Sequence, residues 1–141
     1  MKQKRQLDLN DAGAIADACR SKATEIGVDM DIAVTDDAGH LLLFQRMDGA
    51  RITSIEIAIS KAFTAAAARK STRDYGTAAQ PGNPAYGIEV SHQGRFMIVA
   101  GGLPVFVDGE IVGGVGCSSG TPDQDEIVAA AGVDAFNALN N

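Results

Sequence analysis

Apolar residues recur along this chain with two different periods, and the period predicts the type of each element. Residues 10–26 carry apolar side chains at the three- and four-residue spacing of one helical face, which predicts a helix capped by Asn10 and ended by Gly27. An alanine-rich stretch over 54–68 repeats that spacing and follows Thr53, a typical N-cap residue. Both segments are therefore expected to be amphipathic helices packed on the rest of the chain.

Alternation with a period of two predicts strands elsewhere, separated by residues typical of turns. Asp108-Gly109 is a strong signal for a tight hairpin turn, because both central residues of such a turn need a positive φ. We interpret Gln93-Gly94 in the same way, after a loop-like stretch, 76–87, that contains two prolines and three glycines. The five strands expected are 32–35, 40–47, 88–91, 96–107 and 111–117.

The order of these elements predicts the fold class. A helix, two strands, a helix, three strands and a helix, with hairpins between strands, indicate a mainly antiparallel five-stranded sheet with flanking helices. That arrangement is an α+β fold of the profilin-like or PAS-like kind. A chain of 141 residues that is 45% hydrophobic is long enough for one sizeable core, so we expect a single domain over 1–141.

The stretch Gly101–Asp125 combines a glycine-rich strand with the start of the last helix. Thr121 is the expected N-cap, Pro122 suits the first helical position, and Gln124 completes a capping box. Ser118-Ser119-Gly120 precedes them, so hydroxyls, backbone amides and the positive end of a helix converge where a polar or anionic ligand could bind. The simpler alternative is a strand-to-helix connection that needs glycine only for its backbone.

Charge and composition exclude several classes of partner. A net charge of −6 argues against non-specific binding to nucleic acid and against an anionic membrane surface. No apolar run is long enough to span a bilayer, and the basic start MKQKRQLDLN lacks the apolar region of a secretory signal. The two cysteines are far apart without a CxxC motif, which disfavours a metal cluster or a redox dithiol and makes a reducing, cytoplasmic location the default.

Candidate chemistry rests on a few charged or titratable side chains. His92 borders the proline- and glycine-rich loop and is the better histidine for ligating iron, the alternative being a solvated turn residue. Arg46 and Arg95 lie on or beside strands, where either could hold a carboxylate or form an ion pair with an acidic residue such as Asp125. Lys61 could pair with a ligand anion, although a solvated helix lysine is more usual.

These candidates predict where a pocket should lie. We expect it between the loop 76–87, the strand 95–102 and the glycine-rich stretch 114–121. Arg95 would neutralise a carboxylate of the ligand there, and Asp125 would orient that arginine or accept a proton as a general base.

Four stretches of sequence together resemble one family. They are DDAGHLLLFQRMDGA at 36–50, SIEIAISKAFTAAA at 54–67, QPGNPAYGIEVSHQGRFMIVAGGLPV at 80–105 and GEIVGGVGCSSGTPDQDEIVAAAG at 109–132. In this order they resemble the haem-binding GlcG/HbpS-like family, and also the C-terminal domain of the PduO-type corrinoid adenosyltransferases. The positions that match the family are Arg46, Lys61, Thr64, Arg95, Gly101, Gly102, Pro104, Gly114, Gly116, Gly120, Gln124 and Asp125.

The resemblance implies a five-stranded antiparallel sheet between helices and a homo-oligomer. It also implies haem binding in some members, redox sensing with a partner kinase system in others, and genes that often lie in catabolic operons. In the corrinoid-associated members a histidine of the first helix is the implied iron ligand. This chain has no histidine there, so His92 remains the candidate.

Three hypotheses follow from the residues and the resemblance. The leading one is a binding protein for haem or another carboxylate-bearing small molecule, with no nucleic-acid or membrane partner. The alternative is an enzyme that acts on a small organic acid, with Arg46 or Arg95 as an anion clamp and Asp125 as general base. The third is a purely structural oligomer in which the arginines are paired internally.

Overall fold

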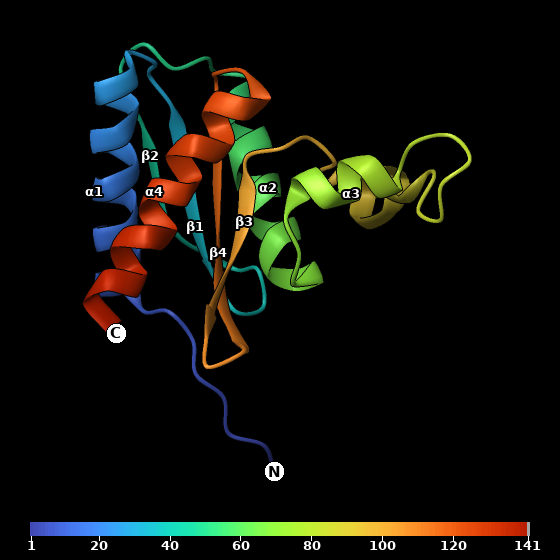
Figure 1. The fold of residues 1–141 in the computed structure, drawn as a ribbon, viewed down its shortest axis with the longest axis horizontal. Helices are drawn as coiled ribbons and strands as arrows, with labels where there is room; N and C mark the ends of the chain where they lie inside the picture. Colours follow the sequence, from blue (N-terminus) through green and yellow to red (C-terminus); the bar gives the residue numbers. More distant parts are fainter. Residues whose placement is uncertain (141) are drawn as a thin grey trace.

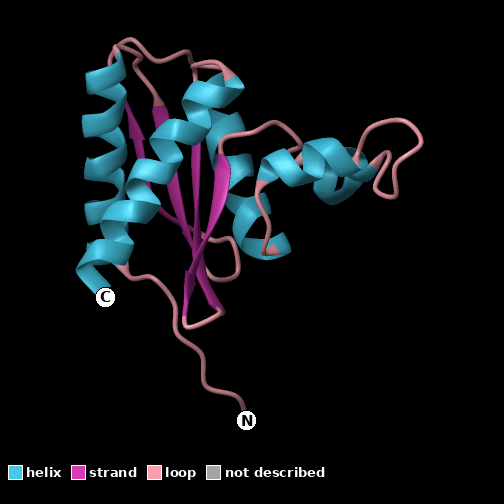
Figure 2. Cartoon of the chain, in the orientation of Figure 1, coloured by secondary structure: helices cyan, strands magenta, loops and turns pink. Residues whose placement is uncertain are grey.

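The chain folds into three layers, seen edge-on in the computed structural model (Figures 1 and 2). The structure describes residues 1–140. Helices α1 and α4 pack together on one face of a central sheet, and α2 covers the other face. In chain order the elements are α1 (Leu9–Ile26), β1 (Asp31–Asp36), β2 (Leu41–Arg46), α2 (Ser54–Ala68), α3 (Thr72–Ala78), the 3₁₀ helix η1 (Ile88–Gly94), β3 (Gly102–Val107), β4 (Glu110–Ser118) and α4 (Pro122–Asn140).

The sheet has four strands in the order β2-β1-β4-β3, and every neighbouring pair is antiparallel. The hairpin β3–β4 turns at Asp108 and Gly109, whose φ values of 50° and 78° confirm the predicted turn. β1 lies between β2 and β4, so its buried residues alternate between the two helical layers.

The expectation of five strands is wrong, because residues 88–91 and 96–101 form no strand. Gly87 has a φ of 89°, and His92, Gln93 and Gly94 have φ values of 55°, 58° and 81°. The hairpin expected at Gln93-Gly94 is therefore absent, because left-handed residues on both sides of a short helical stretch leave no extended segment to pair. Together α3, the following loop and η1 form an arm that extends away from the three layers (Figure 1).

Two helix starts also differ from the prediction. Asp8 rather than Asn10 caps α1: Asp8 Oδ1 accepts a 2.9 Å hydrogen bond from the Asp11 amide, and Asp11 Oδ2 accepts a 3.0 Å bond from the Asp8 amide. Thr53 precedes α2 with helical backbone angles (φ −62°, ψ −24°), and its side chain makes no capping hydrogen bond. An N-cap normally needs an extended backbone to reach the first-turn amides, so α2 begins without a side-chain cap.

The two faces of the sheet are packed differently. Between the sheet and α1/α4 lies the larger core of aliphatic side chains, including Ile15, Val34 and Val115. On the α2 side the helix backbone approaches the sheet directly, since a Cβ on Gly116 would meet the carbonyl oxygen of Ala58. The glycines of β4 therefore set the close spacing of α2 and the sheet, and they fix the position of every α2 side chain near that face.

Candidate functional site

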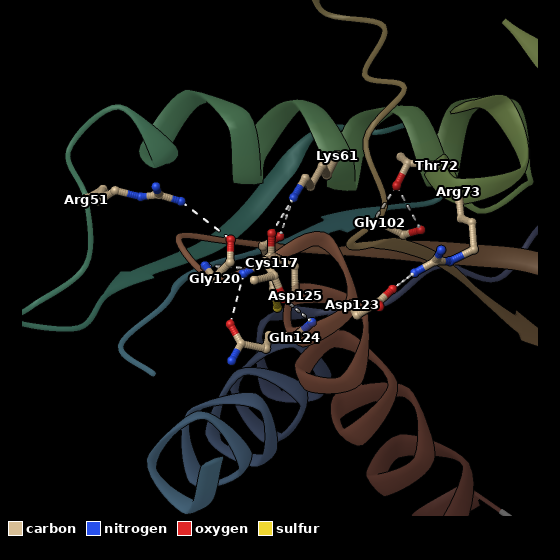
Figure 3. A network of polar contacts seen from close by, with 11 residues as sticks. Arg51, Lys61, Thr72, Arg73, Gly102, Cys117, Gly120, Asp123, Gln124 and Asp125 are labelled. Carbon is tan, nitrogen blue, oxygen red and sulfur yellow. Dashed lines mark hydrogen bonds and ion pairs between the residues drawn. The ribbon is translucent and has the colours of Figure 1, made fainter. Parts of the chain in front are cut away.

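A buried ion pair joins helices on opposite faces of the sheet (Figure 3). The Lys61 ammonium on α2 lies 2.8 Å from Asp125 Oδ2 in the first turn of α4, and it donates a 2.9 Å hydrogen bond to the carbonyl oxygen of Cys117. The Lys61 and Asp125 side chains are 1% and 4% exposed. Because water is excluded, each charge depends on the other for its stabilisation. The interpretation of Lys61 as a solvated helix lysine is wrong.

The second oxygen of Asp125 is also engaged. Asp125 Oδ1 accepts a 2.8 Å hydrogen bond from the Gly120 amide. The predicted capping box is confirmed, since the Thr121 amide donates to Gln124 Oε1 at 2.9 Å and the Gln124 amide donates to Thr121 Oγ1 at 3.2 Å. The strand-to-helix loop is thus held by its own helix start, and the Gln124 carboxamide oxygen serves that cap.

Glycines around the ion pair make room for it. A Cβ on Gly101, where φ is 129°, would come within 2.8 Å of Lys61 Nζ, and one on Gly102 would come within 2.5 Å of the Lys61 carbonyl oxygen. The Gly102 amide donates a 2.9 Å hydrogen bond to Thr72 Oγ1. The space beside these glycines, and beside Gly116, is filled by protein atoms. This agrees with the simpler alternative, in which the stretch needs glycine for its backbone and not for a ligand.

A pocket of about 250 Å³ opens beside the ion pair, between the starts of α2 and α4. Arg95 and the loop 76–87 do not line it. A second pocket, of about 410 Å³, does lie between two of the expected walls, because Gly76 and Gln80 line it with Ile98 to Ala100, but Arg95 and the stretch 114–121 do not. The structure brings Ser118 and Gly120 to the 250 Å³ pocket with Lys61 and Asp125. The residues that line the 250 Å³ pocket are Arg51, Thr53, Ser54, Ile57, Lys61, Met97, Val99, Ser118, Gly120, Pro122 and Asp125.

The two candidate arginines lie elsewhere. The Arg95 guanidinium stacks 3.9 Å from the centre of the Phe63 ring, so the alternative in which Arg95 pairs with Asp125 is wrong. Arg46, at the end of β2, borders a different cleft of about 520 Å³ that also contains Arg20. The structure therefore separates the predicted anion clamps from the carboxylate predicted to act with them.

His92 is exposed and lies on an aromatic cluster. Its ring centre is 5.7 Å from that of Phe63 and 6.1 Å from that of Phe96, and Tyr75 packs edge-on against Phe96 at 4.7 Å. His92 Nδ1 lies 3.0 Å from Ser91 Oγ. With Arg95 over Phe63, this group forms a surface, called here the His92 patch, that is separate from the 250 Å³ pocket.

Sequence reasoning missed Asp31, a fully buried carboxylate at the start of β1. Neither of its oxygens has a hydrogen-bond partner among residues 1–140. Its neighbours in the sheet are Arg46 on β2 and Ser118 on β4. Burial raises the pKa of Asp31 to about 6, against the opposing effect of the positive charges of Arg46 and Arg51.

It also missed Arg51 and Ser54, which precede and begin α2. The Arg51 amide donates a 3.0 Å hydrogen bond to Ser119 Oγ, and its guanidinium reaches Gly120 O at 3.5 Å (Figure 3). Arg51 therefore links the loop before α2 to the loop before α4. The sequence carries no signal for this contact, because Thr53 is a typical N-cap residue and only the fold brings the two loops together.

Other expectations concern metals, thiols and membranes. Cys19 and Cys117 are both buried and free, and burial raises the pKa of the Cys117 thiol well above its usual value, which disfavours the reactive thiolate. Within the described residues there is no group of three or more histidine, cysteine or acidic side chains arranged to hold a metal ion. None of the helices in residues 1–140 is both long and apolar enough to cross a membrane.

Comparison with known proteins identifies the family. The family model "Haem degrading protein HbpS-like" matches residues 7–134. The chain belongs to the HbpS-like family. An uncharacterized 15.0 kDa protein encoded in the dhaT-dhaS intergenic region of Citrobacter freundii is 41% identical over 133 residues, which are 94% of each protein.

Solved structures agree with this assignment. The crystal structure of Klebsiella pneumoniae protein ORFY has a TM-score of 0.96 and 39% identity, and the match covers 99% of this chain and 96% of that one. A crystal structure of a PduOC:haem complex has a TM-score of 0.90 and 31% identity over 94% of this chain and 96% of that one. The α+β fold of one antiparallel sheet with flanking helices is therefore shared with these proteins.

Proposed function

We propose that this protein binds haem at the His92 patch, with His92 as an axial ligand of the iron. Membership of the HbpS-like family and the haem complex of a relative that is 31% identical support haem as the ligand. The observation that carries the location is an exposed imidazole packed on Phe63 and Phe96 beside a guanidinium.

The chemistry of the His92 patch fits haem. The iron needs an accessible nitrogen, and Nδ1 of His92 faces Ser91, which leaves Nε2 for the metal. Arg95 could pair with a haem propionate, because a guanidinium binds carboxylates with two parallel hydrogen bonds. The 250 Å³ pocket lies below the range of about 300–1,000 Å³ for sites that enclose drug-sized ligands, so it does not fit haem.

The backbone beside His92 supports a role beyond packing. His92 and Gln93 are consecutive non-glycine residues in the left-handed region, with φ values of 55° and 58°. Such residues store strain and are concentrated at ligand sites. This conformation presents the imidazole on the surface of the arm, where bound iron would supply a centre for redox chemistry or for a further ligand.

Titration with hemin tests the proposal, because the chain contains a matched control. The sequence has two histidines, and the other one, His40, is exposed near Asp36 at the end of a hairpin. We expect a Soret band on titration of the unmodified protein, a loss of at least about tenfold in hemin affinity in His92→Ala, and no change in His40→Ala.

Three outcomes contradict the proposal. Absence of hemin binding by the unmodified protein removes haem as the ligand. Equal affinity in His92→Ala removes the patch, and an equal loss in His40→Ala shows that hemin binds histidines non-specifically. Arg95→Ala should weaken binding about tenfold and lower the melting temperature only slightly, because the exposed guanidinium contributes one stacking contact on the Phe63 ring.

We also propose that the protein is a homo-oligomer. A surface patch covers only one side of a haem, so a second copy would cover the other. Exposed apolar side chains on the arm, Tyr86 at 69% and Val90 at 79%, support association of the arm with another chain. Light scattering that gives the monomer mass at all concentrations would exclude this assembly.

A further inference from the structure

The 250 Å³ pocket beside the Lys61–Asp125 pair is positively biased at its mouth. The N-terminus of α2 opens there without a side-chain cap, and the N-terminus of α4 faces the same space through Gly120 and Pro122. Helix N-termini carry partial positive charge, although the Ser54 and Ile55 amides of α2 already donate hydrogen bonds to the carbonyl oxygens of Arg51 and Ile52. Arg51 lines the pocket, and its one side-chain hydrogen bond, to Gly120 O at 3.5 Å, is long.

Acidic side chains near the pocket do not cancel this bias. Asp125 lines the pocket, but both of its oxygens are engaged, by Lys61 and by the Gly120 amide. Asp31 lies next to Ser118 in the sheet but does not line the pocket, and its partner in the neighbouring strand is Arg46. Arg51 is the arginine that lines the pocket, and its guanidinium contacts a carbonyl oxygen rather than a carboxylate.

Two serines in the pocket wall can offer their hydroxyls to a ligand. Ser54 and Ser118 are 2% and 4% exposed, and both line the pocket. Neither hydroxyl is among the fully enclosed polar atoms of residues 1–140 that lack a partner, so both oxygens remain open to the pocket. Each hydroxyl can donate one hydrogen bond and accept others, which suits a polar group that enters the pocket.

Much of the remaining wall is apolar, with Ile57, Met97 and Val99, and Thr53 adds a further hydroxyl. A small pocket with one guanidinium, two serine hydroxyls and apolar sides matches a short aliphatic acid that carries a second oxygen. The carboxylate would lie against the Arg51 guanidinium near the positive end of α2, and the second oxygen would bond to the serines.

We infer that this pocket binds a small hydroxycarboxylate, at a site separate from the His92 patch. The inference does not rest on haem binding, because it uses none of the residues of that patch. L-Lactate is the probe, since it combines a carboxylate, a hydroxyl and a methyl group within a few atoms. Acetate lacks the hydroxyl, and methyl lactate keeps the hydroxyl but lacks the charge.

The experiment follows backbone amide shifts of the full-length protein during titration with each probe. We expect lactate to shift the amide signals of Ser54, Ser118 and Gly120 and to bind more tightly than acetate. We expect methyl lactate to leave these amide signals unchanged. Arg51→Leu should weaken lactate at least about tenfold, the loss expected when a charged hydrogen-bond partner is removed.

Matched variants separate binding from folding. Ser118→Ala should weaken lactate several-fold, whereas Ser60→Ala, on the same helix as Ser54 but outside the pocket lining, should not. Arg20→Leu is the corresponding control for Arg51→Leu. Melting temperatures of all four variants show whether each is folded.

The inference is overturned if lactate binds no more tightly than about 10 mM, if methyl lactate binds as well as lactate, or if Arg51→Leu and Ser118→Ala keep full affinity while folded. Hemin titration of the same variants is an independent readout. Loss of lactate binding with unchanged hemin binding supports two separate sites.

Discussion

Asp31 should make the protein less stable as pH rises through about 6. Its carboxylate is fully buried without a hydrogen bond, and its pKa is raised from 3.8 to about 6. A raised pKa means that the folded state holds a proton more tightly than the unfolded state does. The resulting stabilisation is fully present below about pH 4 and is lost as pH rises through about 6.

The magnitude follows from the shift in pKa. A shift of about 2 units corresponds to about 3 kcal/mol of unfolding free energy between the low- and high-pH limits. Between about pH 5 and about pH 8, the contribution that Asp31 loses is about 1.4 kcal/mol. Asp31→Asn removes the titration but keeps the shape, so the variant should gain about 1.4 kcal/mol relative to the unmodified protein over that interval.

Urea unfolding at both pH values measures this difference. An amide at position 31 has its own unsatisfied hydrogen bonds, so the variant can be less stable than the unmodified protein at either pH. That penalty does not depend on pH, and only the change between the two pH values tests the reasoning. Asp134→Asn, an exposed carboxylate on α4, is the control and should show no such change. An equal difference in stability at both pH values for Asp31→Asn would refute the reasoning.

Two further predictions concern the packing of α2. Lys61→Met leaves Asp125 charged and buried, so it should destabilise the protein by about 3–5 kcal/mol. The double variant Lys61→Met with Asp125→Leu should recover much of that loss, which chemical denaturation measures in a double-mutant cycle. Additive losses in the two single variants and the double variant would contradict the pairing. Gly116→Ala should lower the melting temperature strongly, because the new Cβ meets the backbone of α2. Gly13→Ala lies in open space on α1 and should raise stability by about 1 kcal/mol. Equal effects of the two variants would contradict the close approach of α2 to β4.

Elements with local signals could be predicted from the sequence. The hairpin at Asp108-Gly109 and the capping box of Thr121 and Gln124 depend on residues next to each other, and both are confirmed. The segment around His92 failed because its alternating apolar residues resemble a strand. The left-handed backbone of two consecutive non-glycine residues has no clear sequence signal.

The sequence indicates some of the side chains around the ion pair but not their contacts. Lys61, Ser118 and Asp125 are candidate residues from the sequence and they lie together, but their partners depend on how α2 and α4 meet across the sheet. One signal was overlooked. Lys61 shares the apolar face of its helix with Ala58 and Ala65, which is the position of a buried lysine that needs a partner.

The Lys61–Asp125 contact joins residues that are 64 positions apart in the chain. It also requires α4 to be docked, because Asp125 lies in the first turn of that helix. Closing a loop of that length costs entropy before the contact is gained, so we expect the pair to form after the transition state of folding. Removing the pair should then speed unfolding more than it slows folding, a difference that the two arms of a chevron plot measure.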